Sequence, residues 1–383
     1  MKTKTFRNLA FILHRYIGLA VGLLLAFVGL TGSLLVFEPE ISKFLTTRQF
    51  GQVIPQEQQL SSEKILDIAK AAYPMQPEAI HLPKDRYHPY VLQMTSPNAN
   101  PKIYLDGYKE VFVNPYTGAI MGDRPERTTF YRLFLNLHYR LFAEDLGVAI
   151  VGIAAFLMFI LSITGVILWP GWRKLIAGFK IKWNAHPKRV NFDIHKLAGI
   201  IAAAFFVVIA FTGFCWNFHD FTTPLIYTAT FTTPPPEPPV SKLIAGRNPL
   251  KLSPILKQVD ATLPGTKTTV IYLPESPKDI FVAYKKFPQD STDYNNAVYL
   301  DQYSGEVLQV EDGRKQKLGD RILNSFTPIH YGTFGGLPTR IFYVFVGLAP
   351  LVLFITGFVM WRYRYRAKSG SQMNARELAR QNR

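Results

Sequence analysis

The chain has 383 residues, of which 48% are apolar and 18% are charged, and its formal net charge is +16. Four segments contain no Asp, Glu, Lys or Arg over 21 or 22 residues: 16–37, 148–169, 197–218 and 341–361. About 20 apolar residues in a helix are enough to cross a hydrocarbon core of about 30 Å. The composition therefore excludes a water-soluble protein and a disordered chain, and it predicts four transmembrane helices in a lipid bilayer.

The positive charge is concentrated in three short segments beside these spans. Residues 1–15, 171–196 and 362–383 together contain 18 Lys and Arg and 2 acidic residues, which accounts for the whole +16. Short basic segments stay on the cytoplasmic side of a membrane. We therefore expect a multi-pass protein of a bacterial inner membrane with both termini in the cytoplasm. The charge marks topology and does not indicate binding to nucleic acid.

This topology divides the chain into eight parts. In order, we expect a cytoplasmic N-terminus with the first span (1–37), a first periplasmic module (38–147), the second span (148–170), a cytoplasmic loop (171–196), the third span (197–218), a second periplasmic module (219–340), the fourth span (341–361) and a cytoplasmic tail (362–383). The sequence has a single cysteine, Cys215. The periplasmic modules therefore have no disulfide and must be stabilised by packing.

The sequence also contains an internal repeat. Four intervals run from a His to the Gly of a Thr-Gly pair: 18 residues for His14–Gly32 and for His195–Gly213, and 27 residues for His138–Gly165 and for His330–Gly357. Matched intervals of this kind are typical of a duplicated unit. We therefore expect two parallel repeats, each made of a span, an outer module and a span, related by a pseudo-two-fold axis along the membrane normal.

The two outer modules resemble each other in their local patterns. Residues 65–74 and 255–264 are amphipathic segments that end at a proline, which predicts one helix in each module. Residues 111–118 and 298–305 alternate apolar side chains and end in a polar turn with glycine, which predicts a strand and a hairpin. The proline-rich segment 234–239 is typical of a stiff linker. The predicted fold class is α+β, with a helix on a small antiparallel sheet in each module.

Four histidines lie at membrane depth, where ionisable side chains are costly and usually functional. The repeat pairs His14 with His195 at the inner ends of two spans, and His138 with His330 toward the outer side. Two opposed imidazoles are a ligand set of haem iron, whereas zinc requires more than two protein ligands. The sequence has no Cys-x-x-Cys-His motif. We therefore expect two haem b groups, with these histidines as the iron ligands.

Other residues near the histidines fit the same interpretation. Gly18 and Gly199 follow the inner ligands by four residues, which leaves space for a porphyrin on the same helix face. Arg15 and Lys196 follow them directly and could pair with propionates, as Arg140 could on the outer side. Each feature also has a structural explanation, because small residues pack helices and basic residues flank spans.

The residues on the outer side leave further alternatives open. Tyr139 and Tyr331 follow the outer ligands and are candidates to lie beside the substrate, although aromatic residues also gather at membrane interfaces. His219 ends the third span, where it could be an alternative outer ligand, a substrate-side group or an interfacial histidine. The substrate cleft is expected between the two modules, above the outer haem. We expect no catalytic residue beyond the haem edge.

These motifs resemble the PepSY-associated transmembrane-helix family of bacterial iron-regulated membrane proteins. The resemblance covers nearly the whole chain and rests on the opening segment 14–18, the Thr-Gly pairs, the strand-turns of the two modules and the closing segment 361–362. Within the family, the chain is most similar to the di-haem ferric-siderophore reductases of the ferrioxamine type. The resemblance implies PepSY-like modules and release of iron by reduction in the periplasm.

The chemistry of hydroxamate siderophores agrees with such an activity. Their hard oxygen donors suit ferric iron and hold ferrous iron poorly, so one electron is enough to release the metal. The partners expected are therefore a ferric hydroxamate siderophore and a membrane quinol or a cytoplasmic electron donor. Two other functions remain open at this point. The protein could be a PepSY-type sensory or peptidase-regulating protein, or a siderophore permease.

Overall fold

The computed structural model describes residues 2–100, 103, 105–244, 246–290 and 292–381. These residues form two compact units. The helical unit contains residues 1–37, 134–223 and 326–383, and the sheet unit contains residues 38–133 and 224–325. Each unit is therefore built from separate stretches of the chain, which passes from one unit to the other four times.

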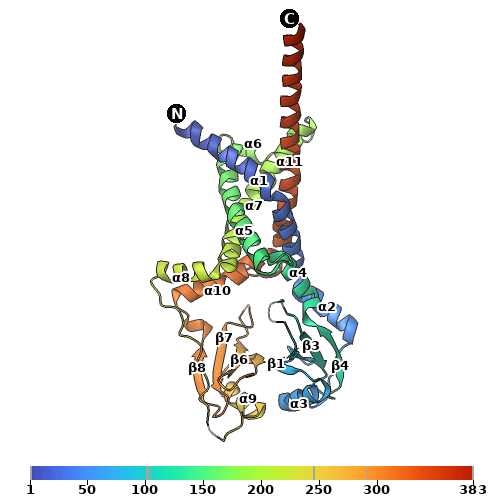
Figure 1. Cartoon of the computed structure of the whole chain (residues 1–383), viewed down its shortest axis with the longest axis vertical. Coiled ribbons are helices and arrows are strands. Elements are labelled where there is room, and N and C mark those ends of the chain that lie inside the picture. The colour runs from blue at the N-terminus through green and yellow to red at the C-terminus, as the bar shows by residue number, and fades with distance from the viewer. Residues whose placement is uncertain (1, 101–102, 104, 245, 291, 382–383) are drawn as a thin grey trace. The chain divides into compact units, whose positions relative to one another are not determined.

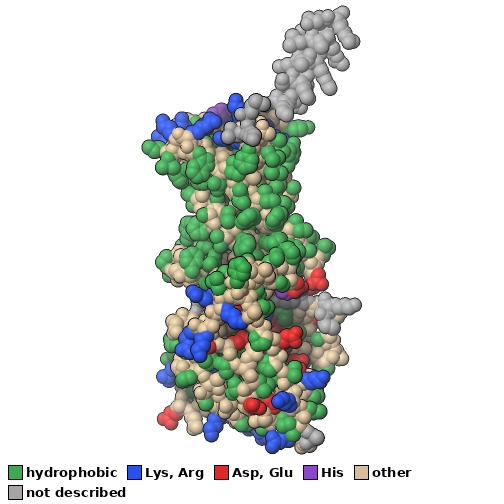
Figure 2. Space-filling view, turned by 90° about the vertical axis from the view of Figure 1, so that its left-hand side faces the viewer, with side chains coloured by type: hydrophobic (Ala, Val, Ile, Leu, Met, Phe, Trp, Pro, Cys, Tyr) green, Lys and Arg blue, Asp and Glu red, His purple; other side chains and the backbone are tan. Residues whose placement is uncertain are grey.

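The helical unit consists of four long helices and several short ones. The long helices are α1 (Lys2–Leu35), α5 (Glu144–Leu168), α7 (Pro187–Asn217) and α11 (Gly336–Gln381). The short ones are α4 (Phe130–Tyr139), η2 (Pro170–Trp172), α6 (Leu175–Phe179), α8 (His219–Ala229) and α10 (Leu318–Tyr331). In the described part of the chain, four helices are long and apolar enough to cross a membrane, and each contains all or nearly all of one uncharged segment of the sequence. Figure 2 shows hydrophobic side chains around this unit and Lys and Arg side chains at one end.

The four long helices lie alongside one another (Figure 1). They form a ring in which α1 packs on α5, α5 on α7, α7 on α11 and α11 on α1. Glycines allow α1 to approach α11 closely. A Cβ atom on Gly22 would lie 2.7 Å from the Phe354 ring, and one on Gly29 would overlap the carbonyl oxygen of Gly347. Contacts of this closeness exclude any larger side chain at these positions. The ring places α1 and α7 diagonally opposite each other.

The turn between α4 and α5 is unusually tight. Leu141, Phe142 and Glu144 have positive φ values of 54°, 54° and 47°, a region that non-glycine residues rarely adopt. A Cβ atom on Gly147 would overlap the backbone of Arg140, so only glycine fits there. This turn packs the last part of α4 into the helical unit. The first outer segment, expected to extend to residue 147, therefore meets the helical unit at residue 134.

The sheet unit contains eight antiparallel strands in the order β4-β3-β2-β1-β5-β6-β7-β8. The strands are β1 (Gln76–His81), β2 (Tyr90–Thr95), β3 (Tyr108–Val113), β4 (Ile120–Pro125), β5 (Lys267–Tyr272), β6 (Ile280–Lys286), β7 (Asn296–Asp301) and β8 (Val307–Glu311). The helical elements of the unit are α2 (Glu38–Phe50), α3 (Ser62–Ala72), η1 (Glu126–Thr128), α9 (Leu252–Ala261) and η3 (Gly313–Lys315). The α+β fold class predicted from the sequence is confirmed.

The two predicted hairpins are present as β3–β4 and β7–β8. Each turn ends at a glycine with a φ of +73°, Gly118 in the first and Gly305 in the second. The side chains of Asn114 and Asp301 accept hydrogen bonds from backbone N–H groups two residues further along the chain. An Asx turn of this kind stabilises the hairpin by replacing backbone partners.

One core connects the sheet with α3 and α9, the two helices predicted from amphipathic segments. Buried and partly buried side chains alternate along β2 and β6, so one face of each strand is buried in this core. Lys285 is also fully buried, and its Nζ donates to the carbonyl oxygens of Val259 and Thr262 at the end of α9. Burial lowers the pKa of Lys285, while the two carbonyl groups compensate for the water that the amine has lost.

The sheet differs from the sequence expectation in one respect. A separate small sheet was expected in each outer module, but β1 pairs with β5 through Ala79–Tyr272, Ile80–Ile271 and His81–Val270. This pairing joins the two four-stranded meanders, edge to edge, into one eight-stranded sheet. Pairing hides two strand edges that would otherwise be exposed.

Candidate functional site

Two pairs of histidines face each other within the helical unit. The ring centroids of His14 and His195 lie 6.2 Å apart with an angle of 88° between the ring planes. His14 is on α1 and His195 is on α7, so this inner pair lies across the diagonal of the ring. His138 on α4 and His330 on α10 form the outer pair, with centroids 6.2 Å apart and an angle of 82°. The structure thus brings together the same two pairs that the sequence intervals matched.

Each histidine is held by a threonine of another helix. The Nδ1 atoms lie within hydrogen-bond distance of threonine Oγ1 in four pairs: His14–Thr164 (3.0 Å), His138–Thr31 (3.1 Å), His195–Thr356 (2.8 Å) and His330–Thr212 (2.7 Å). Backbone carbonyl oxygens reinforce two of these contacts, from Leu161 to His14 at 3.1 Å and from Val28 to His138 at 2.9 Å. All four threonines belong to the Thr-Gly pairs of the long helices.

This network assigns the tautomer of the histidines. Each threonine hydroxyl donates its one hydrogen to a carbonyl of its own helix, for example from Thr164 to Ile160 at 2.8 Å. The hydroxyl therefore accepts a hydrogen bond from the histidine, so Nδ1 carries the proton and Nε2 has a lone pair. Histidines that bind metals commonly donate the other ring N–H to a carbonyl or similar acceptor, which fixes the ring. The four rings are thus prepared for coordination through Nε2.

The glycine of each Thr-Gly pair makes room for the histidine ring. A Cβ atom at these positions would lie against Cε1 of the ring, at 2.9 Å for Gly32–His138, 3.2 Å for Gly165–His14, 3.5 Å for Gly213–His330 and 3.5 Å for Gly357–His195. Threonine therefore bonds the imidazole in all four pairs. Glycine is needed for the close approach of the ring only at Gly32 and Gly165, because a Cβ atom at Gly213 or Gly357 would make an ordinary van der Waals contact. The spacing of these pairs reveals the repeat in the sequence, whereas their contacts with the histidines are visible only in the structure.

The family model described as the PepSY-associated TM region matches residues 11–364. The chain belongs to this family. No curated protein matches the sequence. Because the family is named for a transmembrane region and the four long helices are apolar enough to span, the chain is a multi-pass membrane protein. The matched segment of this PepSY-associated chain includes all four histidines and all four Thr-Gly pairs.

Each histidine pair of this PepSY-associated protein could bind a metal centre that has two imidazole ligands. An imidazole nitrogen binds a metal at about 2.0–2.1 Å and the ring centre lies roughly 1 Å further on, so one metal between two opposed rings separates their centroids by about 6 Å. Both pairs have this separation. Among the described residues, no cluster of three or more His, Cys, Asp or Glu side chains could hold a metal ion. Two ligands suit an iron whose other positions are filled by a porphyrin.

The glycines beside the inner pair differ from those that pack helices. A Cβ atom on Gly18 would have a single neighbour within 4 Å, Leu161 Cδ2 at 3.7 Å, and one on Gly199 would have Leu353 Cδ2 at 3.6 Å. Helix packing therefore does not require glycine at either position, in contrast to Gly22. The absence of a packing requirement is consistent with the expectation that Gly18 and Gly199 accommodate a flat ring.

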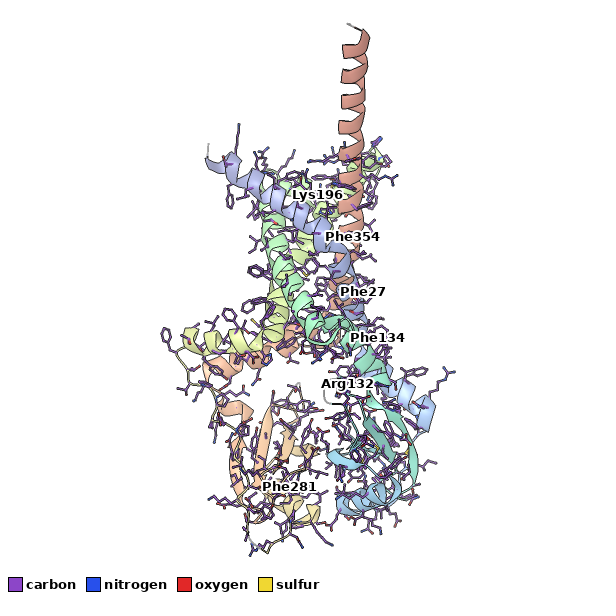
Figure 3. All side chains as sticks on the ribbon, viewed as in Figure 1. Phe27, Arg132, Phe134, Lys196, Phe281 and Phe354 are labelled. Atoms are coloured by element: carbon purple, nitrogen blue, oxygen red, sulfur yellow. The ribbon has the colours of Figure 1, made fainter. Side chains whose placement is uncertain are left out.

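Arg15 and Lys196, the basic residues next to the inner ligands, have different surroundings. Nε of Arg15 is buried without a hydrogen-bond partner, and its guanidinium lies over the Tyr16 ring at 4.5 Å. An unpaired buried N–H of this kind fits a propionate. Lys196, in contrast, donates to Asp193 at 2.7 Å and to the carbonyl oxygens of Ala177 and Lys180 at 2.6 and 3.0 Å. These bonds use all three N–H groups, so Lys196 fixes the loop (Figure 3) and does not fit the propionate role expected for it.

Three further candidates, Arg140, Tyr139 and Tyr331, belong to the segments that carry the outer pair. Arg140 donates to Tyr139 Oη at 2.7 Å and to Glu144 at 2.8 Å. Tyr331 lies beside His330, with ring centroids 6.2 Å apart. Trp216 packs even closer to that histidine, at 4.9 Å, and so forms part of the wall of the outer pair.

His219 is not part of the outer pair. Its side chain is 70% exposed, and Nε2 lies 3.1 Å from an oxygen of Asp220. The outer pair is complete without it, so of the three roles considered for His219 the structure disfavours the ligand role. The substrate-side and interfacial roles stay open.

Proposed function

We propose that this protein is a di-haem b oxidoreductase that passes electrons across the inner membrane to periplasmic ferric hydroxamate siderophores and releases ferrous iron. The observation that carries the proposal is the pair of bis-histidine sites, each with a centroid separation of 6.2 Å. In this proposal His14 and His195 hold one haem, and His138 and His330 hold the other. When bound, haem b supplies reversible one-electron transfer.

The residues of the chain contribute orientation, charge and space to this chemistry. The threonines keep the four imidazoles in the tautomer that coordinates, and the glycines beside the inner pair leave room for a ring. Arg15 offers an N–H to a propionate. On the outer side, Trp216 and Tyr331 surround His330 with aromatic faces. An apolar and aromatic surrounding excludes water, which raises the strength of the electrostatic interactions inside it.

The organisation of the chain supports the same proposal. We infer that residues 1–170 and 171–383 are two parallel repeats and that the four-stranded meanders β1–β4 and β5–β8 are the PepSY-like modules. The basic end of the helical unit faces the cytoplasm, with both termini there. The inner pair then lies on the side of the electron donor, a membrane quinol or a cytoplasmic reductase. The outer pair lies on the side of the substrate.

Reduction of the substrate needs no other catalyst. Ferric iron in a hydroxamate chelate takes up one electron, and the ferrous ion then leaves because the hard oxygen donors hold it weakly. We expect the purified protein, reduced beforehand, to release ferrous iron from a ferric hydroxamate, which a ferrous-specific chelator reports. A siderophore permease would instead accumulate the intact chelate in proteoliposomes, and a sensory protein would do neither.

Gly18 and Gly22 provide a matched test of the space for the inner ring. Gly18→Leu should remove about half of the haem and lower the melting temperature of the haem-free protein less than Gly22→Leu does, because a Cβ atom on Gly18 would meet only Leu161, at 3.7 Å. Gly22→Leu should lower that melting temperature, because the added side chain meets Phe354 and overpacking costs about 1–3 kcal/mol. Full haem content in Gly18→Leu would show that the open space is not used by the cofactor.

A further inference from the structure

A cavity of about 380 Å³ opens at the basic end of the helical unit, between the start of α7 and the last membrane-spanning part of α11. It is lined by His186, Lys188, Arg189, Phe192, Met360 and Arg364. None of these residues has a part in the proposed electron transfer. The cavity lies between two membrane-spanning helices, so molecules at the membrane surface can reach it.

The polar half of the cavity is strongly positive. Lys188, Arg189 and Arg364 line it together with His186, and no acidic side chain that the structure describes does. Arg189 bonds Asp193 at 3.1 Å, but this carboxylate also takes Lys196 at 2.7 Å and is fully buried. One negative charge is therefore shared between two bases, and the cavity keeps a positive excess.

Two of the three basic side chains that carry this charge, Arg189 and Arg364, are oriented by aromatic rings. The guanidinium of Arg364 lies 4.7 Å from the centre of the Phe11 ring on α1, and that of Arg189 lies 5.7 Å from the Phe192 ring. Cation–π contacts of this kind orient a guanidinium without neutralising it. The cavity thus presents preformed positive groups, which suit an anion with several oxygen acceptors.

The other half of the cavity is apolar. Phe192 and Met360 belong to the membrane-spanning parts of α7 and α11, and 37% of the Phe192 surface is exposed. A ligand that fills the whole cavity must therefore combine an anionic group with a hydrocarbon part. A free phosphate satisfies only the first half, and a neutral quinol satisfies only the second.

We propose that this cavity binds one anionic phospholipid of the phosphatidylglycerol type. The phosphate lies among Lys188, Arg189 and Arg364, and an acyl chain lies against Phe192 and Met360. Basic pockets between membrane helices are suited to anionic headgroups, and each basic residue near the surface contributes a few-fold in affinity. This site does not depend on the proposed reductase activity.

The position of the site gives the lipid a structural role. Next to the cavity, Asn191 Nδ2 on α7 donates to the carbonyl oxygen of Thr356 on α11 at 2.9 Å. The Oγ1 atom of the same threonine is the partner of His195. A lipid bound to both helices therefore stabilises the contact that holds the inner histidine.

The test uses the full chain in detergent micelles that contain phosphatidylglycerol, phosphatidylcholine or inorganic phosphate. We expect phosphatidylglycerol to raise the melting temperature and to remain bound in native mass spectrometry, with an affinity that falls as salt is added. The double variant Lys188→Gln/Arg364→Gln should bind it roughly thirtyfold more weakly. The matched variant Arg173→Gln/Lys174→Gln removes two exposed bases outside the cavity and should change the affinity less than threefold.

Other outcomes would overturn the proposal. Equal losses in the two double variants would show diffuse attraction to the basic surface. Equal stabilisation by phosphatidylcholine would show that the site does not distinguish an anionic headgroup from a zwitterionic one. Equal stabilisation by inorganic phosphate would show a site for a free anion. A competing quinol that displaces the lipid from the unaltered protein would assign the cavity to the electron donor. If the Lys188→Gln/Arg364→Gln variant does not fold, the comparison of the two lipids on the unaltered protein decides between these outcomes.

Discussion

Replacing His14 by Ala should remove about half of the bound haem, and replacing His330 by Ala should remove the other half. Each variant deletes one imidazole from one pair, and the remaining histidine cannot by itself supply the two axial ligands. The double variant should contain no haem. The measurement is the haem content per polypeptide from the absorbance of the pyridine complex, compared with the unaltered protein.

A histidine outside the two pairs supplies the control. His88 lies in a loop of the sheet unit, where its Nδ1 is 2.6 Å from an oxygen of Asp85. His88→Ala should therefore keep the full haem content. If the His14 and His330 variants also keep it, the pairing of the histidines proposed here is wrong.

Reduction of an external chelate should require both haem sites in one membrane-spanning path. In vesicles of known orientation, a reductant confined to the side of the basic loops should reduce a ferric hydroxamate on the opposite side. The reason is that His14 and His195 lie near the basic ends of α1 and α7, whereas the other pair is held toward the opposite ends, at Thr31 and Thr212. The rate of ferrous iron release outside the vesicles reports the transfer.

Two variants define what this experiment shows. The variants His14→Ala and His330→Ala should each abolish reduction across the membrane, because each interrupts the path at one end. Direct reduction of the chelate by the haem near the substrate should survive in His14→Ala when reductant is added on the substrate side. Haems that become reduced without any reduction of the outside chelate would contradict transmembrane conduction.

The sequence predicted those parts of the structure that depend on local patterns. The uncharged segments lie within the four long helices to within two residues, and the strand-turns at Gly118 and Gly305 form hairpins, because hydrophobicity and turn chemistry act over short distances. The equal intervals of 18 and 27 residues also matched the histidines that face each other. An equal interval in two halves of the chain indicates which residues occupy corresponding positions, and here the corresponding histidines lie next to each other.

Other features have no local signal. The β1–β5 pairing joins strands that are about 190 residues apart, and it is made by backbone groups that every residue has. The role of Lys196 depends on the carbonyl groups of Ala177 and Lys180 at the C-terminal end of the short helix α6, and the sequence does not show that this helix end lies beside Lys196. The short helices α4 and α10 contain charged residues and so escaped a search for uncharged segments, although they carry the outer histidines into the helical unit.

The Thr-Gly pairs are an intermediate case. Their presence in all four long helices was visible in the sequence, and their distance from the histidines was used to find the repeat. Their function was not visible, because each threonine bonds a histidine of a different helix, and the sequence alone does not show which helices are neighbours. The structure supplies that information through the ring α1–α5–α7–α11.

The haem-to-polypeptide ratio of the purified, unaltered protein is the most direct test of the two bis-histidine sites. The protein should be red, with the spectrum of low-spin haem b and two haem groups per chain, since each pair of imidazoles coordinates one iron. A ratio of two would support the account, and the absence of haem from protein produced with an adequate haem supply would contradict it.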